Sequence, residues 1–105
     1  MKSVLERLRR FNLDRDWTKF HTPSNLAKSI CIEASELLEL FQWQETPKSI
    51  EELKKELADV ILYSIMLADK YDFNIEDLLN KKIDENEKKY PIEKAKGNSK
   101  KYDEY

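Results

Sequence analysis

Apolar residues recur along most of the chain at the three- and four-residue spacing of amphipathic α-helices. The first predicted helix covers roughly residues 2–15. Its apolar face carries Val4, Leu5, Leu8 and Phe11. A linker over residues 17–24 contains a proline, and Ser24 or Asn25 is a suitable cap for the helix that follows. The pattern predicts that this second helix runs to about Trp43.

Two more helices follow in the pattern. The third begins near Ser49, where the sequence SIEE forms a capping box, and extends to about Tyr71. Asn74 caps the fourth helix, and Pro91 ends it. Residues 91–105 are polar and are expected to form a flexible tail. One glycine and three prolines agree with an all-α fold, which we expect to be a four-helix bundle in a single domain over residues 1–105.

Charge and composition exclude several classes of protein. Nineteen basic and 21 acidic residues give a net charge of −2, so no nucleic-acid partner is expected. No apolar run approaches the length of a membrane span, and the start MKSVLERLRR lacks the apolar core of a signal peptide. A single cysteine, Cys31, excludes a disulfide framework. A cytoplasmic location without membrane association is therefore expected.

Two helices place carboxylates where apolar residues are expected. Glu33 falls in the middle of the apolar stripe of the second helix, and Glu36 lies at its edge. On the third helix, Glu56 and Asp59 project next to the apolar stripe, directly before the run VILYSIML at 60–67. Because the connection between these helices is short, we expect them to be antiparallel neighbours. Their four carboxylates then converge.

Four ionised carboxylates near a core are costly, because desolvation and mutual repulsion both raise their pKa values. A divalent cation removes both penalties, and ligation by oxygen alone favours Mg²⁺, or Mn²⁺ as a substitute, over zinc or copper. Di-iron bundles use Glu-x-x-His pairs, whereas the single histidine of this chain, His21, lies in the linker. The alternative is that each pair consists of boundary residues that reach solvent. The residues alone lead to a helical Mg²⁺ site and no further.

Several short sequence motifs occur in an order that is typical of one family. They are EASE (33–36), ELAD (56–59), RDWTKFHTPSNL (15–26), ELLELFQW (36–43), ELADVILY (56–63), KKIDENEKKYP (81–91) and SKKYDE (99–104). In these motifs the chain resembles the MazG-like all-α nucleoside triphosphate pyrophosphohydrolases, and within them the dCTP pyrophosphatase branch. The resemblance extends from about residue 11 to the C-terminus.

The resemblance implies cleavage of a nucleoside triphosphate between the α and β phosphates, which releases a monophosphate and pyrophosphate. Glu33, Glu36, Glu56 and Asp59 are then the Mg²⁺ ligands and the catalytic residues. A carboxylate that the metal does not fully engage can take the proton of the attacking water. Glu36, at the edge of the stripe, is favoured for that role.

The resemblance also implies which residues bind the substrate. Trp17, Trp43 and Tyr63 enclose the base, although the helical spacing of Trp43 and Tyr63 equally suits residues of the bundle core. His21 either orients the linker or touches the nucleotide. The phosphate contacts implied by the resemblance come from the fourth helix and the C-terminal segment: Lys82, Asn86, Lys89, Tyr90, Lys100 and Tyr102.

The run VILYSIML is apolar on nearly every side, so a chain of this length is expected to cover it by forming a homodimer or a homotetramer. Two alternatives to dCTP hydrolysis remain open. In the first, the substrate is another pyrimidine triphosphate, dUTP-like or modified. In the second, the chain is a non-catalytic nucleotide-binding module for dimerisation or regulation, which the four intact carboxylates argue against.

Overall fold

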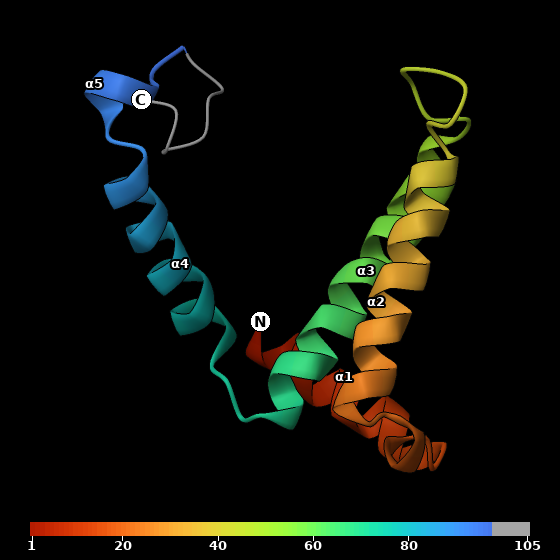
Figure 1. Ribbon diagram of the computed structural model, residues 1–105. Helices are drawn as coiled ribbons and strands as arrows, with labels where there is room; N and C mark the ends of the chain where they lie inside the picture. The colour runs from red at the N-terminus through yellow and green to blue at the C-terminus, as the bar shows by residue number, and fades with distance from the viewer. Residues whose placement is uncertain (98–105) are drawn as a thin grey trace. The chain divides into compact units, whose positions relative to one another are not determined.

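The computed structural model describes residues 1–97 of the chain. It contains five α-helices and one short 3₁₀ helix, η1, and no β-strand occurs within these residues. Their bounds are α1 Lys2–Asp14, η1 Thr18–Phe20, α2 Pro23–Glu39, α3 Ile50–Lys70, α4 Ile75–Lys89 and α5 Ile92–Ala95. The predicted all-α fold is confirmed (Figure 1).

Two helix starts agree with the sequence. The Ser49 hydroxyl accepts a hydrogen bond of 3.3 Å from the backbone N–H of Glu52 at the start of α3. The Asn74 side chain accepts one of 3.0 Å from the backbone N–H of Asp77 at the start of α4. Both side chains satisfy N–H groups that have no partner within the helix, as an N-cap residue does.

The cap of α2 differs from the prediction. Thr22, and not Ser24 or Asn25, accepts the hydrogen bond, from the backbone N–H of Asn25 at 3.1 Å. Pro23 occupies the first helical position. Proline suits that position because its fixed φ is helical and it has no N–H to satisfy. The cap is therefore the residue before the proline.

The end of α2 also differs, because the helix stops at Glu39 rather than near Trp43. Beyond it the backbone tightens: Leu40 N–H donates to Leu37 C=O at 3.2 Å, and Phe41 N–H donates to Leu38 C=O at 2.9 Å. Such bonds to the third preceding residue are a common way to end a helix. The apolar spacing continues into these turns, which is why the pattern did not show where the helix ends.

The segment after Pro91 begins with structure of its own. Pro91 is the N-cap residue of α5, a single helical turn over Ile92–Ala95. The described residues therefore contain five α-helices where the pattern predicted four. The flexibility expected of residues 91–105 stays a prediction, and residues 98–105 lie outside the described part of the chain.

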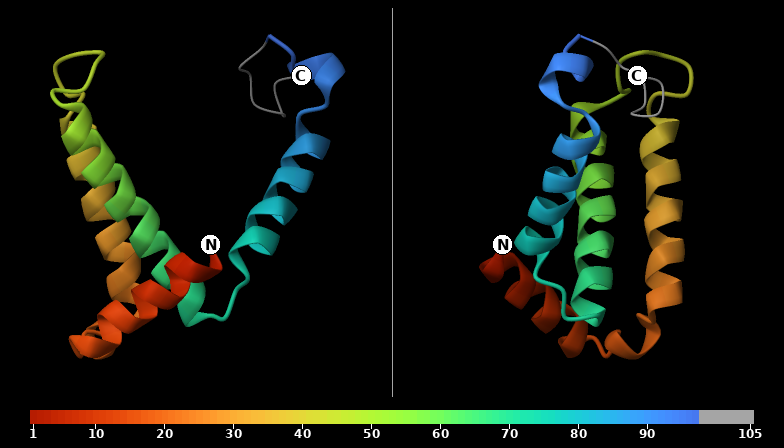
Figure 2. Two further views of the ribbon diagram at one scale, coloured as in Figure 1. Left: turned by 180° about the vertical axis from the view of Figure 1, so that it is seen from behind. Right: turned by 60° about the vertical axis from the view of Figure 1, so that its left-hand side comes forward.

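The chain divides into two compact units, Met1–Asp72 and Phe73–Tyr105. In the first unit, α2 and α3 run antiparallel and side by side, and α1 crosses their ends (Figures 1 and 2). Arg9 of α1 donates two hydrogen bonds to the Asp69 carboxylate of α3, at 3.0 and 2.6 Å. The buried Asn12 amide adds a contact to the Met66 sulfur at 3.3 Å. The α2–α3 hairpin is thus the frame that positions the site.

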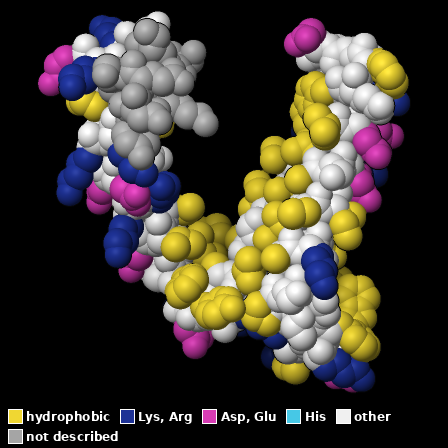
Figure 3. Space-filling model, in the orientation of Figure 1, with side chains coloured by type: hydrophobic (Ala, Val, Ile, Leu, Met, Phe, Trp, Pro, Cys, Tyr) yellow, Lys and Arg dark blue, Asp and Glu magenta, His cyan; other side chains and the backbone are white. Residues whose placement is uncertain are grey.

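The buried apolar core of the described residues is small. It consists of Leu26, Leu40, Ile65 and Ala68. Large apolar side chains on the same hairpin stay open to solvent, among them Leu57 and Ile61, which are 45% and 49% exposed. Figure 3 shows apolar side chains spread over the α2–α3 hairpin. None of the described helices has the length and apolar character needed to cross a membrane.

Candidate metal centre

The antiparallel pairing of α2 and α3 gathers the carboxylates that the sequence placed on two separate helices. Oxygens of Glu33 from α2 and of Glu56 and Asp59 from α3 lie within 4.8 Å of one another. Glu36, one turn after Glu33, is close enough to influence the ionisation of both Glu33 and Glu56. We refer to these four residues as the carboxylate cluster.

Two oxygens of the carboxylate cluster are buried without a hydrogen-bond partner in the described structure, Glu33 Oε2 and Glu56 Oε2. The pKa of Glu33 is raised to about 7, first by burial and then by the close carboxyl of Glu36 and the charges of Asp59 and Glu56. The pKa of Glu56 is raised as well, first by burial and then by Glu36 and Asp59. Without a cation, the site therefore shifts these two side chains toward the protonated form.

The residues of the carboxylate cluster fit a hard divalent cation. Every potential ligand is a carboxylate oxygen, which suits Mg²⁺ or Mn²⁺ better than zinc or copper. Unpartnered buried oxygens are rare in folded proteins, and a cation satisfies them and relieves the repulsion between the carboxylates. The cluster can thus hold a divalent metal.

Tyr63 lies beside the carboxylate cluster. Its pKa is raised by burial and then by the charges of Glu33, Asp59 and Glu36. The ring of His21 meets the Tyr63 ring edge to face, with the ring centres 6.5 Å apart and the planes at 87°. Burial lowers the pKa of His21, and the charge of Lys70 lowers it further, so the imidazole is neutral at physiological pH. The structure therefore brings His21 and Tyr63 together next to the carboxylates.

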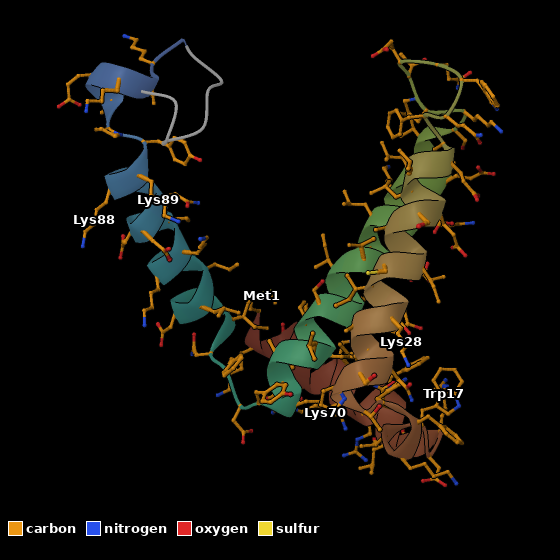
Figure 4. The ribbon with its side chains drawn as sticks, in the orientation of Figure 1. Met1, Trp17, Lys28, Lys70, Lys88 and Lys89 are labelled. Carbon is orange, nitrogen blue, oxygen red and sulfur yellow. The ribbon has the colours of Figure 1, made fainter. Side chains whose placement is uncertain are left out.

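The two tryptophans lie outside the apolar core. Trp43 follows the end of α2 and is 83% exposed, so the alternative of a core role for Trp43 is wrong. Trp17 lies between α1 and η1 and is 45% exposed (Figure 4). Its ring meets Phe11 edge to face at 5.6 Å, and the Arg15 guanidinium lies 3.8 Å from the centre of the Phe11 ring. Both tryptophans present aromatic surface to solvent.

The residues expected to contact phosphates lie in the second unit. Lys82 and Lys89 on α4 both approach one oxygen of Glu85, at 3.5 and 3.3 Å. The carbonyl of Asn86 accepts the backbone N–H of Tyr90 at 2.8 Å, where α4 ends. The remaining two expected contacts, Lys100 and Tyr102, lie outside the described residues.

Comparison with known proteins identifies the family. The model of the MazG-like family matches residues 28–105. The chain belongs to the MazG-like family. The match confirms the family resemblance that the sequence motifs indicated.

Individual relatives of this MazG-like chain agree with that assignment. It is 35% identical to dCTP pyrophosphatase 1 of Mus musculus over 112 residues, covering 94% of this chain and 66% of the mouse protein. It is also 35% identical to dCTP pyrophosphatase 1 of Homo sapiens over 114 residues, covering 96% of this chain and 67% of the human protein. The chain thus spans about two thirds of the length of these relatives.

A solved structure shows the same fold. A pyrophosphatase from Archaeoglobus fulgidus superposes on the MazG-like chain with a TM-score of 0.81 and 40% sequence identity. The superposition covers 87% of this chain and 92% of the archaeal chain.

Two polar residues of the MazG-like chain acquire contacts that the sequence pattern did not predict. Asn25, considered only as a helix cap, donates its side-chain amide to the carbonyl of Phe20 at 3.0 Å. Lys70, to which the pattern gave no role, donates to the carbonyl of Thr18 at 3.4 Å. Both carbonyls belong to η1, directly before His21. In the sequence, the one signal of these contacts is an asparagine two residues after Pro23.

Proposed function

We propose that the chain is an Mg²⁺-dependent nucleoside triphosphate pyrophosphohydrolase. It cleaves the bond between the α and β phosphates of dCTP, or of a related or modified pyrimidine deoxynucleotide, and releases the monophosphate and pyrophosphate. Membership of the MazG-like family and similarity to proteins named dCTP pyrophosphatase 1 support this reaction. The observation that carries the proposal is the carboxylate cluster, with its two unpartnered buried oxygens.

In this proposal, Glu33, Glu36, Glu56 and Asp59 hold the cation, with Mn²⁺ as a possible substitute for Mg²⁺. When bound, the cation neutralises the triphosphate and polarises the phosphorus under attack. Phosphoryl transfer needs positioning and charge stabilisation more than covalent catalysis, so a site built from carboxylates is sufficient. Glu36, the exposed member of the glutamate pair on α2, takes the proton of the attacking water.

Aromatic residues beside the carboxylate cluster receive the base. The His21–Tyr63 pair provides one wall, because it stands next to the carboxylates. Trp17 precedes α2 and Trp43 follows it, so the two exposed rings lie at opposite ends of a 17-residue helix and one chain offers a base only one of them, which contributes about 1–3 kcal/mol when the base stacks on it. The triphosphate is held by the basic and polar residues Lys82, Asn86, Lys89, Tyr90, Lys100 and Tyr102.

The deciding experiment measures hydrolysis of dCTP with and without Mg²⁺ and follows both pyrophosphate and phosphate. The variant is Glu33→Gln, which keeps the size of the side chain and removes its charge. Glu39→Gln is the matched control, because Glu39 is an exposed glutamate of the same helix outside the cluster. We expect Mg²⁺-dependent release of pyrophosphate that falls by about two orders of magnitude or more in Glu33→Gln and stays unchanged in Glu39→Gln.

Other outcomes separate the alternatives. Stepwise release of phosphate contradicts cleavage between the α and β phosphates. Binding of dCTP without turnover favours a non-catalytic nucleotide-binding module of the same fold. Faster turnover of another nucleotide in a panel of the eight common triphosphates assigns a different base or sugar preference to the same site.

A further inference from the structure

Hydrogen bonds from three different helices hold the segment between α1 and α2. The backbone N–H of Trp17 donates to the carbonyl of Asn12 at 2.9 Å, which ties the start of the segment to α1. The carbonyl of Thr18 accepts from the Lys70 amino group of α3 at 3.4 Å, and the carbonyl of Phe20 accepts from the Asn25 amide of α2 at 3.0 Å. Each of the three helices of the first unit therefore contributes at least one hydrogen bond to this segment.

Asn25 can make its contact because of its place in α2. It is the third residue after the cap, and its backbone N–H is already satisfied by Thr22. Its side-chain amide is then available to reach back across the proline to η1. The bond requires a donor, because the Phe20 carbonyl can only accept.

The residue that follows Phe20 is His21, so the asparagine bond fixes the backbone directly before the imidazole. The His21 ring rests edge to face against Tyr63 and is half-buried there. Lys70 projects from the last turn of α3 near the segment that carries Trp17 (Figure 4). An aromatic pair of this geometry gives only a modest attraction, so the orientation of His21 depends on the backbone that carries it.

We propose that Asn25 is a positioning residue which, with Lys70, holds His21 against Tyr63 and so preforms the base-facing wall beside the carboxylate cluster. The base-facing role rests on the proposed function, whereas the positioning does not. Because this wall is already ordered in the free protein, nucleotide binding loses less conformational entropy than it would if binding had to order the wall. Asn25 therefore acts on substrate binding and base selection without touching the reacting atoms.

The substitution Asn25→Asp tests the proposal. The two side chains have nearly the same shape, but an ionised aspartate cannot donate to the Phe20 carbonyl. A negative charge in the first turn of α2 also favours the helix, so the fold is retained. Ser24→Asp is the matched control, because it adds the same charge at the neighbouring exposed position. Lys70→Met, at an exposed position, is a second variant that removes the other contact.

The first readout is the NMR signal of the imidazole, which is unambiguous because the chain contains one histidine. We expect the Tyr63 ring to shift the proton resonances of His21 in the wild type, and Tyr63→Leu provides the reference without this shift. We expect Asn25→Asp, and to a smaller degree Lys70→Met, to move the His21 resonances toward the Tyr63→Leu position, and Ser24→Asp to leave them in place. Wild-type positions in both Asn25→Asp and Lys70→Met overturn the proposal.

The second readout is the kinetics of dCTP hydrolysis. We expect Asn25→Asp to raise KM by about three- to tenfold, the range that one lost hydrogen bond produces, with kcat nearly unchanged. Its preference for dCTP over dATP falls in parallel, while Ser24→Asp keeps the wild-type values. Unchanged KM and preference overturn the role in base selection. A wild type that hydrolyses no nucleotide overturns the proposed function instead, and the His21 resonances still decide whether Asn25 positions the imidazole.

Discussion

The carboxylate of Glu33 is half-buried, has one unpartnered oxygen, and has a pKa raised to about 7, chiefly by burial. A folded protein rarely keeps such a group without a reason, because an apolar residue of similar volume would pack at that place without the penalty. When it is ionised, the side chain opposes folding of the metal-free chain, and we expect it to contribute to the proposed metal site once a cation is bound. Its effect on stability therefore depends on pH and on metal.

We expect the metal-free protein to lose stability as the pH rises. The folded-state pKa of Glu33, about 7, lies above the ordinary value of 4.5, so folding favours the protonated form. The stabilising contribution is complete below the ordinary value and is lost as the pH rises through about 7. Urea unfolding in the presence of a chelator, between about pH 5 and pH 8, measures this change in the free energy of unfolding.

Two controls accompany the pH series. We expect Glu33→Gln to reduce the dependence, because the substituted side chain does not titrate, and to leave the part that comes from the raised pKa of Glu56. Saturating Mg²⁺ restores stability at the alkaline end, because the cation binds the ionised carboxylates of the folded state. A metal-free stability that rises between pH 6 and pH 8 by about 1 kcal/mol or more contradicts the environment described for Glu33.

Glu85 offers a second prediction about a single side chain. It engages both Lys82 and Lys89 through one oxygen, and the two lysines lower its pKa. If these lysines bind the triphosphate, Glu85 competes with the substrate for their charge. We expect Glu85→Gln to lower the KM for dCTP by about two- to fivefold, the range for exposed ion pairs.

The effect of Glu85→Gln is expected to weaken at high salt, because exposed charges are screened. Glu87→Gln, another exposed acidic position on α4, serves as the control for net charge. An unchanged or higher KM in Glu85→Gln argues against phosphate binding by Lys82 and Lys89.

Sequence alone located the carboxylates but not their surroundings. Glu33 and Glu36, and likewise Glu56 and Asp59, are one turn apart on regular helices, so their common direction follows from helical periodicity. The contact of His21 with Tyr63 depends instead on the path of an irregular linker. No periodicity describes that path, because hydrogen bonds to distant residues determine it.

Among the elements, the end of α1 carries a strained residue. Asp16 has a φ of +54°, in the left-handed region. Its N–H donates to the Leu13 carbonyl at 3.1 Å, and the next N–H, of Trp17, donates to Asn12 at 2.9 Å. This pair of bonds is a Schellman motif, in which glycine usually occupies the position of Asp16. The motif turns the chain from α1 into the linker that carries Trp17.

We expect Asp16→Gly to stabilise the protein by up to about 1 kcal/mol, because glycine has no Cβ to strain in this conformation. The lost ion pair with Lys19, at 2.9 Å and exposed, offsets little of this gain. Asp16→Ala is the matched comparison: it loses the same ion pair but keeps a Cβ, and we expect it to be less stable than Asp16→Gly. Thermal unfolding orders the three proteins, and equal Tm values for the glycine and alanine variants contradict the strain.

The helices themselves were largely predictable, and the errors have local causes. The starts of α3 and α4 followed from Ser49 and Asn74, whose side chains cap in the predicted way. The end of α2 did not, because Phe41 continues the apolar spacing after the backbone has left the helix. Apolar periodicity reports which face is buried, whereas hydrogen bonds decide where a helix stops.

For the molecule as a whole, the small core of the first unit contrasts with its exposed apolar surface. On α3, Leu57, which lies between Glu56 and Asp59, is 45% exposed, and Ile61, two residues after Asp59, is 49% exposed. Exposed apolar surface of this kind is typical of a protein interface. We therefore expect the chain to form a homodimer or a homotetramer that covers this face of α3.

Sedimentation at micromolar concentration tests the assembly. We expect a mass of at least two chains for the wild type and a shift toward one chain for the double variant Leu57→Glu with Ile61→Glu. Lys55→Glu, at an exposed polar position of the same helix, controls for the added charge and is expected to leave the assembly intact. A monomeric wild type at this concentration contradicts the prediction.

The pairing of α2 with α3 across residues 40–49 has a consequence for the order of folding events. Contacts between helices joined by a short connection are local in sequence, and local contacts form early and fast. The carboxylates come from both helices, so they gather only after the hairpin has formed. We expect a cation that binds them to act on the formed hairpin, and so to slow unfolding rather than to speed folding. We therefore expect added Mg²⁺ to lengthen the lifetime of the folded chain and to leave its rate of folding nearly unchanged.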